Sequence, residues 1–316
     1  MALHMLCKER GEKMLEGILP DDIYSIISTR VNWKAVNEIR LRADKPVVIT
    51  VGGNRFFLGE NGITTKLNEA LYSNKTMIED IIFRASEYSI YSVNEQIKKG
   101  FIMTKGGIRL GIGGNLIEEK GCIKTMTNFS SLNIRIPHEI RNCSLKAYNS
   151  IVNDDKILNT LIIAPPGAGK TTFLRDFVCQ LSERNLAYSV LVLDERGELD
   201  TGKKGSLGNF TDIISFARKK VGFENGIRSL APDLIITDEL NEQEDIEAVR
   251  YAINCGVSII ASTHASNLES FTKKEAFKKL IEEKAFKRYV VLSKKDGPGT
   301  FEGIYNETFS RAQIWY

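Results

Sequence analysis

The sequence contains no C-x-x-C pair, and its five cysteines are scattered along the chain. An odd, scattered set supports neither a disulfide framework nor a zinc site and is typical of reduced, cytosolic cysteines. No apolar stretch approaches the roughly 20 residues that are needed to span a bilayer, and residues 1–13 hold no apolar core of signal-peptide length. We therefore expect a cytoplasmic protein that reaches a membrane only through partners.

An excess of charge of one sign is also missing. The 316 residues carry 43 lysines and arginines against 40 aspartates and glutamates, a net charge of +3. So small a charge implies by itself neither a nucleic-acid partner nor a membrane partner. No segment has low complexity, and a hydrophobic share of 42% is enough for ordinary globular cores. This length fits one core-rich domain and one further domain.

The pattern of the chain changes near residue 150. After that point apolar, strand-like runs alternate with helical patterns, which favours an α/β domain with a mostly parallel sheet covered on both faces. The expected strands are 161–164, 189–194, 234–238, 257–263 and 289–293, and the expected helices are 171–182, 211–219, 242–254 and 272–286.

The N-terminal part predicts a smaller α+β domain. Residues 36–58 alternate as β-strands do, 76–87 have a helical pattern, and glycines at 106–107 and 113–114 suit a hairpin over 100–117. Residues 1–4 resemble a vector-derived extension. The expected organisation is an α+β domain over 5–137, a connecting helix-rich segment over 138–157 and a P-loop ATPase domain over 158–316.

The P-loop prediction rests on LIIAPPGAGKTTFLRDFV, residues 161–178, where a buried strand, a glycine turn and an amphipathic helix follow one another. Glycines in such a turn let successive N–H groups point into one concavity at the positive end of the helix, which makes an anion site. Lys170 can reach the β- and γ-phosphates of ATP, and the Thr171 hydroxyl can ligate Mg²⁺. The pattern departs from G-x-x-x-x-G-K-[ST] only in having Ala164 at the first position. The predicted nucleotide-binding residues are Pro165, Pro166, Gly167, Ala168, Gly169, Lys170, Thr171 and Thr172.

A second motif is PDLIITDEL, residues 232–240, which places two carboxylates at the end of a buried strand. In P-loop enzymes that end faces the nucleotide. Asp238 can therefore hold Mg²⁺, partly through water, and Glu239 can polarise the water that attacks the γ-phosphate. Such an adjacent glutamate indicates hydrolysis. The alternative for the pair is an ordinary acidic N-cap for the following helix.

Two further strand ends carry polar residues. VLDERGEL, residues 192–199, contains Asp194, Glu195 and Glu198 around one arginine, and STHAS, residues 262–266, contains His264. Either cluster alone could be a capping or turn feature. Together with the two motifs above they predict four strand ends that converge on one crevice.

In this order the four motifs resemble the Walker A, Asp box, Walker B and His box of the secretion-superfamily ATPases of type II and type IV systems. The sequence is still more similar to one family in that group, the stage III sporulation protein AA family of endospore-forming bacteria. The four-cysteine metal module of the type II branch is absent, and Asp238 stands where that branch commonly has glycine. The similar segments are EIRLRADKPVVI (38–49), GGIRLGIGGN (106–115), SSLNIRIPHEI (130–140), APPGAGKTT (164–172) and VLDERGEL (192–199).

The resemblance implies an N-terminal domain joined to a RecA-like motor domain, with six chains in a ring and the nucleotide between the two domains. It implies that arginines of the N-terminal domain face the phosphates. Arg109 and Arg135 are the candidates, with a surface ion pair as the alternative for each, and Arg196 and Arg228 are further ones. Glu195 becomes the acidic-box carboxylate. The implied function is ATP hydrolysis in the mother-cell cytoplasm that energises or assembles a membrane-embedded sporulation channel during endospore formation.

Two other functions remain open. Residues 272–295 hold nine lysines and arginines against three glutamates, a pattern that can follow nucleic-acid phosphates or anionic lipid. The segment lacks interleaved aromatic residues for base stacking, and a solvated helix face is its plainer interpretation, so no nucleic-acid partner is expected. The third possibility is a nucleotide-dependent switch that hydrolyses little ATP.

Overall fold

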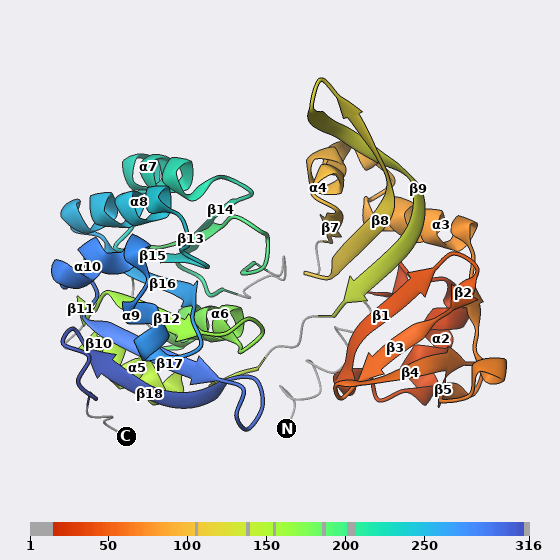
Figure 1. The fold of residues 1–316 in the computed structure, drawn as a ribbon, viewed down its shortest axis with the longest axis horizontal. Helices are drawn as coiled ribbons and strands as arrows, with labels where there is room; N and C mark the ends of the chain where they lie inside the picture. The colour runs from red at the N-terminus through yellow and green to blue at the C-terminus, as the bar shows by residue number, and fades with distance from the viewer. Residues whose placement is uncertain are drawn as a thin grey trace. The chain divides into compact units, whose positions relative to one another are not determined.

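The computed structural model describes residues 15–104, 107–136, 140–153, 156–184, 188–200 and 207–312. The chain divides into two compact units, Met1–His138 and Glu139–Tyr316, which are called here the N-terminal and the C-terminal unit (Figure 1). Among the described residues, no helix has both the length and the apolar character that crossing a bilayer requires.

The N-terminal unit is built on one antiparallel sheet. Its elements are α2 (Asp21–Arg30), η1 (Trp33–Ala35), β1 (Val36–Arg42), β2 (Lys45–Pro46), β3 (Val48–Val51), β4 (Asn54–Gly59), β5 (Gly62–Thr64), η2 (Leu67–Glu69), β6 (Tyr72–Ser73), α3 (Lys75–Ala85), η3 (Ile90–Val93), α4 (Asn94–Lys98), β7 (Phe101–Met103), β8 (Arg109–Glu119) and β9 (Cys122–Arg135). The strand order is β5-β4-β3-β1-β9-β8-β7. The short strands β2 and β6 pair separately.

Local sequence explains most of this unit. Burial alternates along β1, with Ile39 and Leu41 inside the core, as the period of a strand requires. Helix α3 begins after Asn74, whose side chain accepts a hydrogen bond from the N–H of Met77 at 2.8 Å. The predicted strands over 36–58 and the predicted helix over 76–87 are confirmed.

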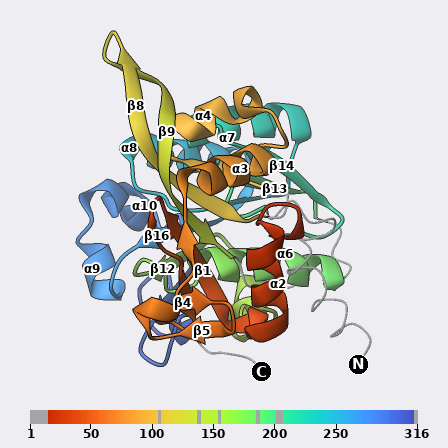
Figure 2. The same ribbon diagram turned by 90° about the vertical axis from the view of Figure 1, so that its right-hand side faces the viewer.

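The predicted hairpin over 100–117 is only partly correct. Strands β7 and β8 do pair antiparallel, but Gly113-Gly114 does not turn the chain. Instead β8 continues to Glu119, and the turn to β9 follows at Lys120-Gly121, both with positive φ. Gly106 and the expected domain boundary at Pro137 lie outside the described residues. In Figures 1 and 2 the far part of the β8–β9 hairpin extends past the other strands of its sheet.

A close backbone approach explains the glycines inside β8. The β8–β9 register shifts between Gly113 and Asn115. A Cβ atom added to Gly114 would lie 2.6 Å from the backbone oxygen of Thr127 on β9. These glycines therefore allow a bulge, which is the other common use of glycine in a strand pattern.

The C-terminal unit is an α/β unit whose sheet has the order β14-β13-β15-β16-β12-β17-β18. All neighbouring strands in it are parallel except the last pair. Its elements are α5 (Leu145–Ile151), β10 (Val152–Asn153), β11 (Lys156–Ile157), β12 (Thr160–Ala164), α6 (Lys170–Glu183), β13 (Val190–Asp194), β14 (Thr211–Ser215), α7 (Lys219–Leu230), β15 (Leu234–Thr237), α8 (Gln243–Asn254), β16 (Ser258–His264), α9 (Leu268–Thr272), η4 (Glu275–Phe277), α10 (Lys278–Glu282), β17 (Arg288–Ser293) and β18 (Thr300–Asn306).

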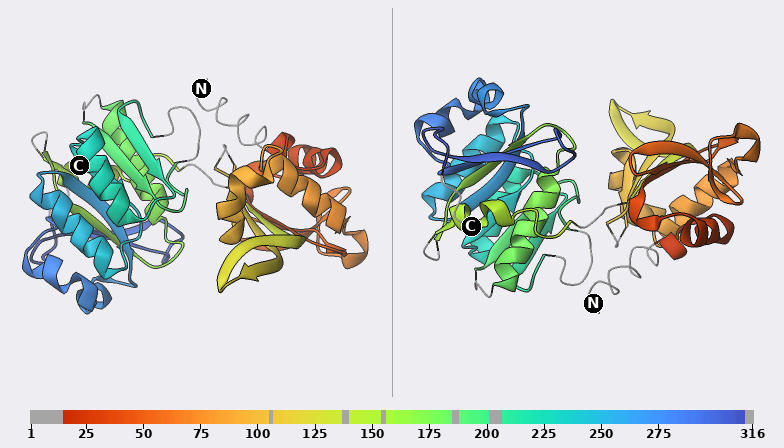
Figure 3. Two further views of the ribbon diagram at one scale, coloured as in Figure 1. Left: turned by 90° about the horizontal axis from the view of Figure 1, so that it is seen from above. Right: turned by 90° about the horizontal axis from the view of Figure 1, so that it is seen from below.

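The sheet of this unit separates two apolar cores (Figure 3). Along β12, Ile162 and Ala164 join one core with α5 and α6, whereas Leu161 and Ile163 join the other with α7 and α8. Strands that are buried on both faces have continuous apolar runs in their sequence, which is why the sequence pattern predicted these strands. Because both faces of the sheet are covered, the charged side chains of these strands lie at the strand ends.

Two predicted helices of this unit are wrong. Residues 211–215 form β14, a strand parallel to β13, and the helix that follows begins only at Lys219. A short apolar run does not distinguish strand from helix, and here the pairing with β13 decides. The expected helix over 272–286 is not continuous. The range holds only the last residue of α9, the short helix η4 and the short helix α10. Strand β18 was not predicted.

A buried carboxylate ties the start of the C-terminal unit to α6. Asp176, only 3% exposed, accepts hydrogen bonds from the backbone N–H of Asn142 and of Ser144, both at 2.8 Å, and from the Ser144 hydroxyl at 2.6 Å. Residues 142–144 lead directly into α5, whose Tyr148 packs on Phe177 of α6. The segment expected to be a connection therefore contributes to the core of this unit.

We expect Asp176→Ala to lower the free energy of unfolding by about 3 kcal/mol, because it leaves two backbone N–H groups and one hydroxyl without their acceptor. Urea denaturation followed by circular dichroism measures this. Asp212→Ala, at an exposed position on β14, is the matched control and should change stability little. Equal stability of the two variants would contradict the assignment.

Candidate active site

Four polar strand ends meet at one edge of the C-terminal sheet. Strands β13, β15, β16 and β12 are hydrogen-bonded neighbours and run parallel, so their carboxyl ends share that edge. The edge carries Asp194, the Asp238-Glu239 pair, His264 and the loop before Lys170. The predicted convergence of four strand ends is therefore present in the fold.

The loop over 165–169 has the backbone geometry of an anion-binding turn. Gly167 and Gly169 have φ values of 69° and 87°, which favour glycine, and Gly169 caps the N-terminus of α6. Lys170 is the first residue of that helix, and Thr171 and Thr172 complete its first turn with half-buried side chains. The open N–H groups of a helix start and its positive dipole end suit a phosphate.

The turn between β17 and β18 lies against this loop. The Gly299 N–H donates to the Ala168 carbonyl oxygen at 3.2 Å. The Lys294 ammonium nitrogen lies 3.1 Å from the point where a Cβ of Gly167 would be. Lys294 is thus a cation beside the loop that the sequence analysis missed, because only folding brings the two together.

The Lys170 side chain is buried and already has partners. Its Nζ donates to the Ala164 carbonyl oxygen at 3.3 Å and lies 2.6 Å from Nδ1 of His264. Burial lowers the pKa of Lys170 to about 8, although Glu239 and Asp238 act in the opposite direction. At neutral pH the lysine is still mostly a cation.

His264 joins Lys170 to Glu239. A protonated Lys170 needs Nδ1 as an acceptor, so the ring proton is assigned to Nε2, which lies 3.0 Å from Oε1 of Glu239. Burial and the neighbouring ammonium of Lys170 lower the pKa of His264, which keeps the ring neutral. A neutral ring can accept from one neighbour and donate to the other at the same time.

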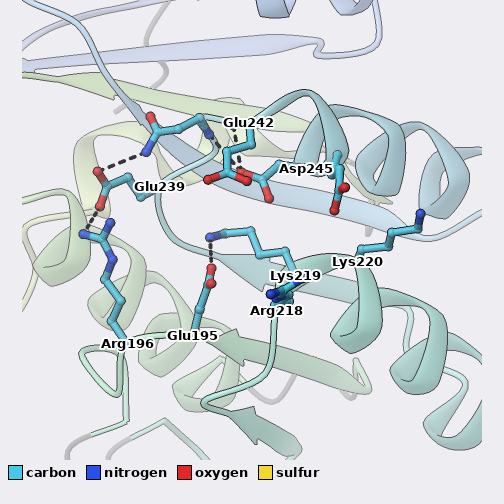
Figure 4. Close-up of a pocket in the computed structure, with 10 residues that line it drawn as sticks. Glu195, Arg196, Arg218, Lys219, Lys220, Glu239, Glu242 and Asp245 are labelled. Carbon is cyan, nitrogen blue, oxygen red and sulfur yellow. Dashed lines mark hydrogen bonds and ion pairs between the residues drawn. The ribbon is translucent and has the colours of Figure 1, made fainter. Parts of the chain in front are cut away.

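The Glu239 carboxylate is held from several sides (Figure 4). Arg196 forms an ion pair with Oε2, and the Asn241 amide donates to Oε1 at 3.1 Å. The backbone of Glu239 has φ 37°, an unusual value for a residue with a side chain, and its N–H donates to the Ser262 hydroxyl at 3.0 Å. The residue predicted to activate water is therefore firmly positioned.

Asp238 is a buried carboxylate with an unused oxygen. It is 4% exposed, and its Oδ1 has no hydrogen-bond partner. Burial raises its pKa to about 7, and the neighbouring Lys219 opposes that shift. A buried, unpartnered carboxylate oxygen fits a hard divalent cation, and the Thr171 hydroxyl is the other candidate ligand. Within the described ranges no three His, Cys, Asp or Glu side chains group together as a metal site, so Mg²⁺ would take its other ligands from phosphates and water.

The acidic cluster after β13 divides into two roles. Asp194 accepts hydrogen bonds from the N–H groups of Glu198, Leu199 and Asp200 at 2.8 to 2.9 Å, so it organises its own loop. Burial raises the pKa of Asp194, and those hydrogen bonds oppose the shift.

Glu195 instead faces a pocket of about 390 Å³ beside Glu239. Its Oε2 accepts from the Lys219 ammonium at 2.6 Å (Figure 4). Lys219 is the first residue of α7 and is only 6% exposed. Because the predicted helix over 211–219 ended at Lys219, the sequence pattern did not place this lysine at the start of a helix beside Glu195. Arg228 lies in the last turn of α7, at the opposite end of that helix.

Arg109 and Arg135 belong to the N-terminal unit. They stand opposite each other in the β8–β9 ladder. The Arg109 guanidinium lies 4.4 Å from the centre of the Phe101 ring, and Arg135 is exposed and 3.9 Å from a Glu38 carboxylate oxygen. Their contact with a nucleotide stays a prediction.

Comparisons with known proteins place the chain in a family. The family model described as "Sporulation stage III, protein AA" matches residues 8–312. The chain belongs to that family. Stage III sporulation protein AA of Bacillus subtilis (strain 168) is 32% identical over 299 residues, which cover 92% of this chain and 94% of that protein. The resemblance seen in the sequence motifs is confirmed.

Solved structures identify the fold. The ATPase DotB of Yersinia pseudotuberculosis has a TM-score of 0.58 at 16% identity, covering 87% of this chain and 76% of that one. The pilus retraction motor PilT with bound ADP has a TM-score of 0.56 at 14% identity, with coverages of 84% and 76%. At such identities the likeness concerns the fold alone. The predicted RecA-like fold with a smaller α+β domain before it is confirmed.

Replacing Asp238 tests the free-energy cost of burying its charged carboxylate. Because the folded state raises its pKa from 3.8 to about 7, the folded state binds the proton more tightly than the unfolded state, and stability falls as pH rises from 4 to 7. Asp238→Asn removes this dependence. The stability of the variant relative to the unaltered chain should therefore improve by about 2 to 3 kcal/mol between pH 5 and pH 8.

Denaturation at both pH values without nucleotide and Mg²⁺ measures this difference. Asp212→Asn, at an exposed position, should show no such trend. A stability difference between Asp238→Asn and the unaltered chain that does not change with pH would refute the buried, high-pKa carboxylate.

Proposed function

We propose that this protein is an ATPase of the secretion type that energises or assembles a membrane-embedded complex during endospore formation. The observation that carries the proposal is the joining of Lys170, at the start of the phosphate-binding helix, to Glu239 through one histidine. A glutamate this close to a phosphate-binding lysine suits hydrolysis of the terminal phosphoanhydride bond.

The roles follow from where each group lies. The backbone N–H groups around Gly169 and the Lys170 ammonium bind the β- and γ-phosphates. Glu239 orients the attacking water and takes up its proton. Thr171 and Asp238 would hold Mg²⁺, which supplies neutralisation of phosphate charge when bound. Bound phosphate also brings negative charge to Lys170, whose burial otherwise disfavours the cation.

The site also needs charge from outside the C-terminal unit if it follows related motors. We propose that Arg109 and Arg135 approach the γ-phosphate in a ring of six chains. As neighbours across the β8–β9 ladder they present two cations at one place. Leu116, Ile117 and Ile123 near the hairpin end are exposed, which suits contacts with partner proteins.

Membership of the stage III sporulation protein AA family supports a role in endospore formation. We propose that this role is in the mother cell, at a channel that feeds the forespore. We propose that the chain reaches the membrane only through channel proteins.

The nucleic-acid alternative has less support. Residues 272–295 do not form one basic helix, and their apolar residues, including Phe277 and Leu280, are buried in the core. Lys273 pairs with Glu269 at 2.5 Å, and Lys278 lies 3.8 Å from a Glu275 carboxylate oxygen. The segment is therefore better explained as a solvated surface than as a phosphate-binding track.

In vitro hydrolysis tests the proposal directly. We expect Mg²⁺-dependent ATP turnover that single-stranded DNA does not change. Glu239→Gln should lower kcat at least about 100-fold while nucleotide binding is retained, because only the general base is lost. Lys170→Ala should instead weaken binding, and Lys287→Ala, at an exposed position, should do neither. Strong stimulation by DNA would favour the alternative function, and turnover by Glu239→Gln equal to that of the unaltered chain would refute the assigned base.

Sporulation assays test the process. Lys170→Ala and Glu239→Gln at the native locus should each block development after engulfment and abolish heat-resistant spores, because the channel would lack its energy source. Immunoblots should show unchanged protein abundance. Normal spore counts in either strain would show that hydrolysis is not what the process requires.

A further inference from the structure

A continuous line of polar contacts crosses the candidate site. It runs from Lys170 on α6 to His264 at the end of β16, then to Glu239 after β15, and ends at Arg196 after β13. The three contacts join four strand-end segments that are separated by up to 94 positions in sequence. Nothing in the nucleotide-binding pattern requires the last member, Arg196.

Glu239 has little capacity left for a water molecule in this arrangement. A carboxylate can accept about four hydrogen bonds. Here Oε1 already accepts hydrogen bonds from the His264 ring at 3.0 Å and from the Asn241 amide at 3.1 Å, and Oε2 forms an ion pair with the Arg196 guanidinium. A guanidinium is the strongest of these partners because the hydrogen bond is charge-assisted.

Lys170 is occupied at the other end of the line. Its ammonium has three N–H groups, of which one faces the Ala164 carbonyl and one faces His264. A γ-phosphate carries more negative charge than an imidazole nitrogen and is the better acceptor. When Lys170 turns to the phosphate, His264 loses the donor that fixes its tautomer, and its contact with Glu239 changes.

We infer that Arg196 is a positioning residue that holds Glu239 in an inactive place until a γ-phosphate engages Lys170, with His264 as the link. This inference rests on the proposed ATPase function and adds a device that restrains hydrolysis. Arg196 suits the role because its side chain is half exposed and lies on the pocket wall beside Glu239, so it can swing away without disturbing either core (Figure 4).

The test compares affinities for two nucleotides in the full chain. Fluorescent ADP and fluorescent AMP-PNP, a non-hydrolysable ATP analogue, are titrated in the presence of Mg²⁺. AMP-PNP must break the restraint, whereas ADP need not. Arg196→Ala should therefore bind AMP-PNP about fivefold more tightly than the unaltered chain does, which corresponds to the loss of one partly exposed ion pair. Its affinity for ADP should be unchanged. Arg196→Lys should return most of the original ratio of the two affinities.

Arg218→Ala is the matched control, since Arg218 is an exposed arginine on the wall of the same pocket. It should leave both affinities unchanged. Weaker AMP-PNP binding by Arg196→Ala would mean that Arg196 contacts the phosphate itself, and equal changes for both nucleotides would mean a merely structural role. Either result would overturn the inference.

Ring signals of ¹⁵N-labelled histidine give a second readout that needs no turnover. The chain has three histidines, so His264→Gln identifies the relevant signal. Arg196→Ala and added AMP-PNP should each shift that signal, whereas Arg218→Ala should not. If the unaltered chain bound neither nucleotide, the proposed function would fail. An unshifted His264 signal in Arg196→Ala would by itself refute the line of contacts.

Discussion

Parallel pairing of β13, β15, β16 and β12 is the constraint on which the candidate site depends. Parallel strands end at one edge of their sheet, so residues far apart in the sequence are brought together there. Each strand also alternates its side chains between two apolar cores, which disfavours charged groups along the strands. The charged residues are therefore gathered at the strand ends by the same burial that stabilises the unit.

Burial of charge gives this edge its chemical character. Lys170, Lys219 and Asp238 are each less than 10% exposed, and burial disfavours the charged form of such groups. Each lysine has a nearby hydrogen-bond partner, His264 for Lys170 and Glu195 for Lys219. The Oδ1 oxygen of Asp238 has none. Phosphate and a divalent cation would supply the partners that this edge lacks, which supports the proposed nucleotide site.

The comparisons and the geometry support the function at different levels. The family match covers almost the whole chain and concerns sporulation, whereas the solved structures concern the fold alone. Neither describes the contacts of Arg196 or Lys219. Lys219 follows β14, a strand that stands in place of a predicted helix, whereas Arg196 follows β13, which periodicity predicted. The contacts that hold Glu195 and Glu239 are thus revealed only by folding.

The sequence by itself determined the local features of this protein. The strand, glycine turn and helix around Lys170 and the apolar run before Asp238 are set by periodicity and by the φ values that glycine permits, which act over a few residues. Tertiary structure decided the rest. Residues 211–215 form a strand because they pair in parallel with β13. Gly114 lies in a bulge because β9 approaches its backbone closely. The partners of Glu195 and Glu239 come from segments whose register no local pattern encodes.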